Sequence, residues 1–196
     1  MSGEILERWL EGVLATPGLT AIADPAEAHR VLIEDALRAT SLVDAAGGPV
    51  VDVGSGGGSP GVPLATALPT LAFTLLEAER RKCEFLRETT AGLENVEVVW
   101  GRAEEQPTDA FAVALAKALA KPPVAAELCL PLVREGGIAV LWVGATADPE
   151  RVARVADRLA ATLEAERDGL LVLRKHGATP PGFPRRPGMA KKRPLA

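Results

Sequence analysis

The feature that most limits the fold of this chain is a glycine-rich turn that follows a short apolar run. The run extends from Pro49 to Val53, and the turn is Gly54-Ser55-Gly56-Gly57-Gly58-Ser59-Pro60-Gly61. A continuous apolar run of this length is typical of a strand buried in a parallel sheet. Glycine lets the backbone turn sharply and approach a ligand, because no Cβ is in the way. Ligands of such sheets bind at the carboxyl ends of the strands, so the turn predicts a ligand site.

Apolar runs and amphipathic stretches alternate along the rest of the chain, which predicts an α/β fold with a doubly wound, mostly parallel sheet covered on both faces. Further strands are expected at 71–76, 96–100, 111–116, 138–143 and 170–173, the last paired with a short strand near 162–166. Helices are expected at 3–15, 24–46, 79–91 and 123–133, the last ended by Gly136-Gly137. Another begins at Asp148, with one face formed by Val152, Val155, Leu159 and Leu163.

The length of 196 residues suits one domain, spanning 1–196. We divide it into an N-terminal helical extension at 1–47, a Rossmann-like core at 48–176 and a basic C-terminal arm at 177–196. The net charge is −4, but after Asp168 there are seven basic residues and no acidic one. An acidic body with a basic arm indicates a polyanionic partner. The alternative is a solvated tail that aids solubility.

The cysteine content and hydropathy predict a cytoplasmic protein that does not cross a membrane. Cys83 and Cys129 provide neither a disulfide framework nor a metal-binding spacing. The longest apolar stretch, Gly136 to Ala145, is about half of what a bilayer requires. Charged residues among the apolar ones of the N-terminus argue against a signal peptide. We expect no metal and a monomeric chain.

Two cofactors are compatible with the glycine turn. Gly56, Gly58 and Gly61 match the dinucleotide pattern G-x-G-x-x-G, which is a weak signal alone. The pattern D-x-G-x-G-x-G, from Asp52 to Gly58, is more specific. An acid at Asp52 can hold the loop and the cationic amino group of a methionine moiety, whereas it would repel a pyrophosphate. The pattern therefore favours S-adenosylmethionine, and a tight turn without a ligand remains the alternative.

Two further acids are candidate cofactor ligands. Glu77 lies 23 residues after Gly54, at the end of the second strand, where a carboxylate can accept both ribose hydroxyls. It would serve NAD and S-adenosylmethionine equally. Glu104 follows the third strand, where methyltransferases commonly place the acceptor of the adenine amino group. Glu104 and Glu105 could instead be the acidic start of a helix, favoured by its dipole.

The sequence offers no evident general base or nucleophile. Cys129 lies on an apolar helix face and Cys83 inside a helix, so cytosine-C5 methylation through a thiolate is not expected. His29 and His176 are far apart in the sequence. Methylation of exocyclic amines commonly uses a polar-Pro-Pro-aromatic motif. Lys121-Pro122-Pro123-Val124 lacks both the polar first residue and the aromatic last residue of that motif. A ring nitrogen with a free lone pair, such as guanine N7, needs no base, so it is the acceptor that fits best.

Several segments together resemble the RsmG family, also called glucose-inhibited division protein B (GidB), of bacterial small-subunit rRNA guanine-N7 methyltransferases. The resemblance covers roughly residues 18–196. It is carried by Leu19–Ile22, Asp24-Pro25, Asp52–Gly61, Arg80–Leu86, Leu93–Val96, Arg102–Glu105, Glu127–Val133 and Phe183–Gly188. It implies a Rossmann-like class I methyltransferase fold, S-adenosylmethionine as cofactor, and 16S ribosomal RNA or the small ribosomal subunit as partner.

The resemblance also implies site residues. Together with the acids and glycines of the loop pattern, it gives a candidate cofactor site of Asp52, Gly54, Gly56, Gly58, Ser59, Glu77, Ala103, Glu104 and Lys117. The basic arm gives candidate RNA contacts at Arg185, Arg186, Lys191, Lys192 and Arg193. With no Tyr, four Phe and three Trp, an aromatic platform for stacking single strands is not expected.

The chain departs from the family pattern mainly on the acceptor side. The family usually has a bulky apolar residue at Ser59 and arginine at Lys117, and lysine does not provide the bidentate guanidinium fork. An Arg-His pair aligns with Val31 and Leu32, a lysine with Val143, and an asparagine with Gly18. One rival is therefore an RNA-binding relative that holds the cofactor without turnover. Another is a nicotinamide dehydrogenase, which Asp52 and the lack of Tyr argue against.

Overall fold

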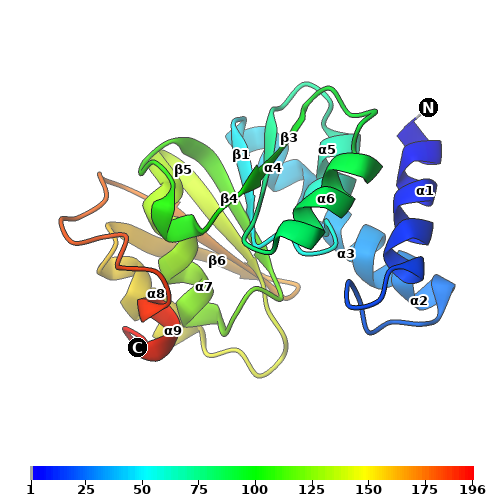
Figure 1. Cartoon of the computed structure of the whole chain (residues 1–196). Coiled ribbons are helices and arrows are strands. Elements are labelled where there is room, and N and C mark those ends of the chain that lie inside the picture. The colour runs from blue at the N-terminus through cyan, green and yellow to red at the C-terminus, as the bar shows by residue number, and fades with distance from the viewer. Residues whose placement is uncertain (1) are drawn as a thin grey trace.

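A computed structural model describes residues 2–196, and its centre is a seven-stranded sheet in the order β3-β2-β1-β4-β5-β7-β6 (Figure 1). The strands are β1 (Val50–Val53), β2 (Phe73–Glu77), β3 (Val96–Trp100), β4 (Phe111–Lys117), β5 (Val133–Trp142), β6 (Ala161–Arg167) and β7 (Leu170–Lys175). The first five strands pair in parallel, and only β7 runs antiparallel to both of its neighbours. The predicted doubly wound, mostly parallel sheet is confirmed.

Helices cover both faces of this sheet. They are α1 (Ser2–Ala15), α2 (Pro25–Ala28), α3 (Asp35–Leu37), α4 (Thr40–Ala46), α5 (Gly61–Ala67), α6 (Arg80–Thr89), α7 (Pro122–Cys129), α8 (Pro149–Asp157) and α9 (Met189–Lys192). Side chains of α4 to α6 are buried against one face, and α1 packs over α5 and α6. Those of α7 and α8 are buried against the other face. Among residues 2–196, no helix is long and apolar enough to span a bilayer.

The long helix predicted over 24–46 is broken into shorter pieces. Its start is confirmed, because Asp24 accepts a hydrogen bond from the Glu27 amide at 2.7 Å. A π-helical turn, His29–Glu34, then separates α2 from α3, and α4 starts only at Thr40. The Thr40 hydroxyl donates to the Leu37 carbonyl at 2.6 Å, a side-chain contact that competes with the helical ladder. Periodicity alone could not reveal either interruption.

The helix predicted over 123–133 is also too long. It ends at Cys129, a 3-10 turn follows over Leu130–Leu132, and β5 begins at Val133. Pro131 has no amide hydrogen to continue the helix. Gly136 and Gly137 therefore lie inside β5, where the register against β4 shifts, and do not mark the end of a helix. A glycine pair in a strand commonly marks such an irregularity.

At the far edge of the sheet, one prediction is confirmed and one is wrong. The short strand expected near 162–166 is β6, which pairs antiparallel with β7. The helix that begins after Asp148 ends at Asp157, so Leu163 belongs to β6 and not to a helix face. Its side chain still packs against the same hydrophobic core cluster as Val152 and Val155. The apolar spacing that suggested one long helix thus spans a helix and a strand.

The C-terminal arm, 177–196, is rich in Pro and Gly, which is typical of an extended segment without regular elements, but the structure differs from that expectation. It contains α9, and Phe183, Leu195 and Ala196 pack against the core cluster formed with α7 and α8. Figure 1 shows the arm, in orange to red, returning toward α7 and α8 and ending with α9, which contacts α7. Pro and Gly set the local backbone, but they do not determine whether a segment docks on the body.

Candidate active site

A cavity of about 630 Å³ lies at the carboxyl ends of β1, β2 and β4. One wall is the glycine loop, and a second is formed by the segments that follow β2, β3 and β4. A third comes from the N-terminal helices and the segment between α1 and α2, and the arm completes the rim. The cavity is lined by residues 53–57 and 59, 76–78, 101–104, 117–120, 188, 190 and 191, with Trp9, Val13, Leu19, Thr20, Ile22, Val31 and Leu32 among others.

The glycine loop turns as the sequence requires. Gly54 and Gly56 have φ values of 70° and 56°, a left-handed region that other residues rarely adopt. The Gly54 amide donates to the Leu76 carbonyl at 2.8 Å, and the Gly56 amide donates to the Glu77 carboxylate at 2.9 Å. A Cβ at Gly56 would have only the Gly54 carbonyl oxygen near it, at 3.8 Å. A side chain there would therefore extend into the cavity.

Asp52 supports the loop from behind and does not line the cavity. Its side chain is 1 % exposed, and its Oδ2 accepts a hydrogen bond from the Gly61 amide at 3.1 Å. Burial raises the pKa of Asp52 from its ordinary value of 3.8 to about 7, while the Gly61 amide opposes the rise. The predicted role in holding the loop is confirmed. The predicted contact with a ligand amino group is wrong, because the carboxylate faces the protein interior.

Gly58 is a packing position and not a ligand contact. A Cβ there would lie 2.8 Å from both the Trp9 Nε1 and a Val62 methyl carbon. The Trp9 indole donates to the Gly57 carbonyl at 2.7 Å, so α1 rests directly on the loop. Glycine is needed at 58 because helices α1 and α5 approach the backbone closely. The third glycine of the pattern thus indicates tight packing behind the site.

The two predicted acids both line the cavity. Glu77, 8 % exposed, also accepts the Glu79 amide at 2.8 Å, so two backbone amides fix its carboxylate. A carboxylate has about four lone-pair sites, which leaves capacity for further donors. Glu104 follows the buried Ala103, and its Oε1 accepts the Gly188 amide of the arm at 2.9 Å. Their contacts with ribose and adenine stay predictions.

Ser59 and Lys117 line the cavity and join it to the N-terminal segments. The Ser59 hydroxyl donates to the Leu32 carbonyl at 2.8 Å. The Lys117 ammonium lies 2.9 Å from an Asp35 carboxylate oxygen and also donates to the Val31 carbonyl. Sequence reasoning missed Asp35, which no motif marks and which only the fold brings to Lys117. Besides Asp35, the main-chain carbonyls of Val31 and Leu32, and not their side chains, hold these two polar groups.

No thiol or imidazole lines the cavity in the part of the chain that the structure describes. Cys83 and Cys129 are both buried, and burial raises the pKa of both thiols. His29 is exposed and lies beside Glu34 in the π-helical turn, with its Nδ1 3.1 Å from the carboxylate. Residues 2–196 contain no group of three or more potential ligands that could hold a metal ion. The cavity therefore offers shape and hydrogen bonds without an evident base.

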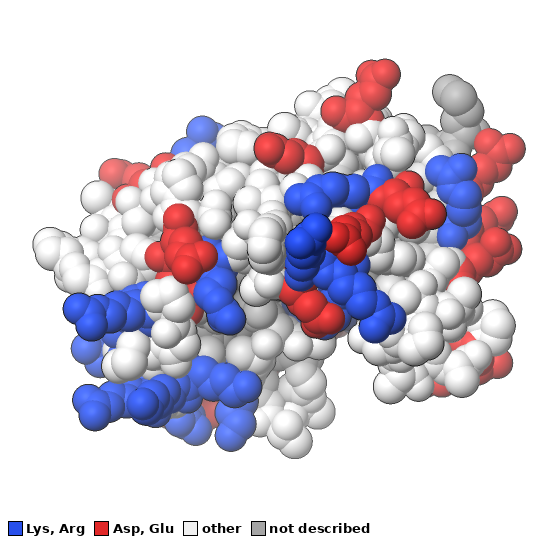
Figure 2. Space-filling model, viewed as in Figure 1, with Lys and Arg blue, Asp and Glu red and all other residues white. Residues whose placement is uncertain are grey.

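The basic residues of the last 28 positions divide into paired and unpaired groups. Arg174, Lys175 and Arg185 form ion pairs with Glu164, Asp109 and Glu127. The other four are exposed and make no ion pair among residues 2–196; they are Arg186, Lys191, Lys192 and Arg193. Figure 2 shows basic side chains gathered around α9, and a second group, mixed with acidic ones, over α6. Lys191 also lines the cavity.

Arg185 is an internal contact of the fold. Its Nε and Nη2 lie 2.5 and 2.7 Å from the two carboxylate oxygens of Glu127, whose side chain is 3 % exposed. This bidentate geometry is the strongest form of an Arg–carboxylate pair. The guanidinium also donates to the Arg193 carbonyl at 2.8 Å. Arg185 is thus engaged in docking the arm, which contradicts its predicted role in binding RNA.

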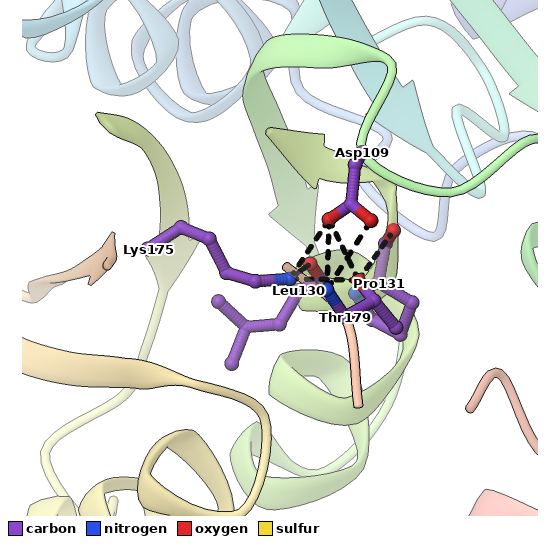
Figure 3. Close-up of polar contacts among 5 residues, drawn as sticks. All are labelled: Asp109, Leu130, Pro131, Lys175 and Thr179. Carbon is purple, nitrogen blue, oxygen red and sulfur yellow. Dashed lines mark hydrogen bonds and ion pairs between the residues drawn. The ribbon is translucent and has the colours of Figure 1, made fainter. Parts of the chain in front are cut away.

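The arm is anchored a second time where it leaves β7 (Figure 3). The Lys175 ammonium is fully buried and contacts the Leu130 carbonyl at 2.9 Å, the Thr179 hydroxyl at 2.8 Å and Asp109 at 3.3 Å. Asp109 also accepts both the amide and the hydroxyl of Thr179. Burial lowers the pKa of Lys175, and Asp109 opposes that change. Two polar clusters thus tie the arm to the body before it reaches the cavity.

Comparison with known proteins identifies the family. Residues 4–169 match the GidB family, described as rRNA small subunit methyltransferase G. The ribosomal RNA small subunit methyltransferase G of Rubrobacter xylanophilus is 38 % identical over 86 % of this chain and 75 % of its own length. The protein of that name from Symbiobacterium thermophilum is 36 % identical over 98 % of this chain and 87 % of its own length.

A solved methyltransferase shares the fold at low identity. It is a T. thermophilus 16S rRNA N2 methyltransferase in complex with AdoMet and guanosine, 18 % identical, with a TM-score of 0.50 over 67 % of this chain and 36 % of that one. The sheet order of the chain and the cavity at its carboxyl edge agree with this Rossmann-like class. The chain belongs to the rRNA small subunit methyltransferase G family and is an S-adenosylmethionine-dependent methyltransferase.

Proposed function

We propose that this chain transfers the methyl group of S-adenosylmethionine to N7 of a guanine in 16S ribosomal RNA, with the cofactor in the cavity against the glycine loop. The family match and the names of its relatives support the reaction and the RNA substrate. Membership of a methyltransferase family removes the dehydrogenase alternative. The observation that carries the N7 assignment is a cavity whose lining of backbone, apolar, acidic, basic and hydroxyl side chains includes no thiol or imidazole among the described residues.

The residues present fit the cofactor. The open space in front of Gly56, which a Cβ would enter, accommodates a ligand lying against the backbone. Gly54, Gly56, Ser59 and Lys117 would border the methionine half of the site. We assign Glu77 to the ribose hydroxyls, because its two carboxylate oxygens are already oriented by amides and keep free lone pairs.

The adenine end of the cofactor would lie beside Ala103 and Glu104. Ala103 provides a small buried surface for a flat ring, and the Glu104 carboxylate retains acceptor capacity for an amino group. The same carboxylate accepts the Gly188 amide, so the arm covers this end of the cavity. Asp52 and Gly58 act one layer behind, by fixing the loop and by allowing α1 to pack against it.

Methyl transfer to guanine N7 requires the protein mainly to align the acceptor nitrogen with the methyl group. When bound, S-adenosylmethionine supplies an electrophilic methyl group on a sulfonium. Guanine N7 carries a free lone pair and no proton, so forming the new N–CH₃ bond while the S–CH₃ bond breaks leaves no proton to remove. The walls hold the acceptor in line and exclude water. The apolar side chains of Leu19, Ile22, Val31 and Leu32 also line the cavity, where they can cover a flat base.

The exposed cations of the arm would bind the RNA backbone. Arg186, Lys191, Lys192 and Arg193 are exposed and unpaired among the described residues, and Lys191 and Gly188 reach the cavity rim. Lysine and arginine neutralise phosphates with release of counterions. We further propose a monomer that works in the cytoplasm, where both buried cysteines stay reduced.

The test is methyl transfer from tritiated S-adenosylmethionine to small ribosomal subunits that lack N7 methylation, followed by borohydride and aniline cleavage of the RNA. We expect strand scission at one labelled guanine, because this treatment cleaves at N7-methylguanosine. Label on pyrimidine C5 or on an exocyclic amine would contradict the N7 assignment. Binding of both S-adenosylhomocysteine and RNA without any transfer would favour the relative without turnover.

A further inference from the structure

One aromatic side chain is placed unlike the others in the molecule. Trp100 ends the edge strand β3 and is 59 % exposed, the only exposed large hydrophobic residue among the side chains that the structure describes. Trp9 is fully buried, and Trp142 donates its indole hydrogen to the Asp35 carbonyl inside the fold. The composition, poor in aromatic residues, argued against a stacking platform, but composition does not reveal which ring is exposed.

The Trp100 ring lies at the rim of the cavity. Its Nε1 donates to the Ala78 carbonyl at 3.0 Å, and Ala78 is a cavity-lining residue after β2. Gly101 and Arg102, the next two residues of the chain, also line the cavity. Trp100 itself does not line it, so the ring stands outside the space proposed for the cofactor. The hydrogen bond fixes the position of the exposed ring, which is therefore preorganised.

A cation lies over this ring. The guanidinium carbon of Arg80, at the start of α6, is 5.9 Å from the centroid of the Trp100 ring. Its Nε lies 2.9 Å from Glu84, which offsets much of its charge. Arg102, two residues after Trp100 in the chain, is exposed and lines the cavity. A flat exposed indole with an arginine over it is an arrangement that can bind single-stranded nucleic acid, by stacking under a base with cation–π support.

We propose that Trp100, supported by Arg80, is the stacking platform for an unpaired nucleotide that neighbours the target guanosine in the RNA. The inference rests on the proposed function for RNA as the substrate and for a guanosine as the target nucleotide. A guanine must leave its helix or loop stack to enter the cavity, and an adjacent base then needs a new partner. The rim ring supplies that partner a short distance from where the target base enters.

The test compares Trp100→Ala with Trp100→Phe, using methyl transfer to small ribosomal subunits and binding of a fluorescein-labelled single-stranded RNA. We expect Trp100→Ala to raise KM and weaken RNA binding by about 10-fold, the scale of one lost base–aromatic stack. The salt dependence should not change, because no phosphate contact is removed. Trp100→Phe keeps a ring and should lie near wild type, and S-adenosylhomocysteine affinity should stay constant in both.

Three results would overturn the proposal that Trp100 stacks under a base. Unchanged KM and RNA affinity in Trp100→Ala would mean that the ring contacts no base. A matching loss of S-adenosylhomocysteine affinity would make the ring part of the cofactor site. A dimer of the wild-type chain that dissociates in Trp100→Ala, seen by sedimentation, would make it an interface between copies. These results differ from a failure of the proposed function. In that case the wild-type chain itself would transfer no methyl group to RNA.

Discussion

The glycine loop and the C-terminal arm both line one cavity, and they are held in different ways. The loop is fixed by backbone amides bonded to nearby acids, as in Gly56 to Glu77 and Gly61 to Asp52. The arm is fixed by contacts between residues far apart in the sequence, Arg185 to Glu127 and Gly188 to Glu104. The partners in these loop contacts are 21 and 9 residues apart in the sequence, whereas the partners in the arm contacts are 58 and 84 residues apart. We expect cofactor binding to depend on the loop and RNA binding on the arm.

The largest expected effect comes from placing a side chain on the loop. Gly56→Val would extend into the cavity from a backbone with φ of 56°, so it both crowds the ligand and strains the turn. We expect S-adenosylhomocysteine affinity to fall by at least about 1000-fold, equal to roughly 4 kcal/mol, in titration calorimetry. Gly144→Ala is the control, because a Cβ there meets nothing within 4 Å. Wild-type affinity in a folded Gly56→Val would put the cofactor elsewhere.

The next effect is a pH dependence that Asp52 imposes on the loop. Its pKa is raised in the folded chain from 3.8 to about 7, so the folded state binds this proton more tightly than the unfolded chain does. The protonated Asp52 carboxyl therefore stabilises the folded state. This stabilisation is fully present below about pH 4 and is lost as the pH rises through about 7. Relative to Asp52→Asn, wild type should lose roughly 4 kcal/mol of unfolding free energy between pH 4 and pH 8.

Urea unfolding at several pH values measures this difference. Asp44→Asn is the matched control, since Asp44 is exposed on α4, and it should keep the wild-type pH profile. An Asp52→Asn protein whose pH profile coincides with that of wild type would contradict the assignment of the proton to Asp52.

A smaller loss is expected when the arm is released. Arg185→Ala leaves the buried Glu127 carboxylate without its partner, which should cost about 3 kcal/mol of unfolding free energy. Arg186→Ala, one residue further on, removes an exposed cation and should change stability by less than about 0.5 kcal/mol. Chemical denaturation of the two variants side by side measures the contrast. Equal losses would mean that the pair with Glu127 does not hold the arm.

The smallest expected effect tests whether the arm binds the RNA backbone in addition to docking on the body. Lys192→Ala with Arg193→Ala removes two exposed cations, and the slope of log RNA affinity against log salt should flatten by about 0.7 to 0.9 for each lost phosphate contact. S-adenosylhomocysteine affinity should stay at the wild-type value. The control is Arg134→Ala. Arg134 is an exposed cation at the start of β5, so it lies at the amino ends of the parallel strands, away from the cavity at their carboxyl ends. An unchanged slope in the double variant would limit the arm to a structural role.

The same contrast explains what could be predicted from the sequence. The apolar run before Gly54, the acid at Glu77 and the alternation of strands and helices are local patterns, and they gave the sheet, the loop and the edge at which the cavity lies. The carboxylate of Asp52 was assigned to a ligand because its spacing is correct, but spacing does not show which way a side chain turns at a strand end. Its burial behind Gly61 is a property of the packed fold.

Long-range partners account for the other differences. Charge counting made Arg185 a candidate RNA contact and included Lys175 in a basic segment without acids, whereas Glu127 and Asp109, 58 and 66 residues away, pair with them. No local signal links Asp35 to Lys117, which lie 2.9 Å apart across the cavity wall. Trp100 was one of three tryptophans in the composition, and only the fold reveals that it is exposed. Sequence patterns predict elements well, and they predict pairings between distant elements poorly.

Amide hydrogen exchange with saturating S-adenosylhomocysteine tests the central claim most directly, namely that the cofactor lies between the glycine loop and the segment after β3. We predict that the amides of residues 53–59 and 101–105 exchange more slowly with the ligand, while those of β7 are unchanged. Slowing confined to other segments, with the glycine loop exchanging at its ligand-free rate, would contradict the account.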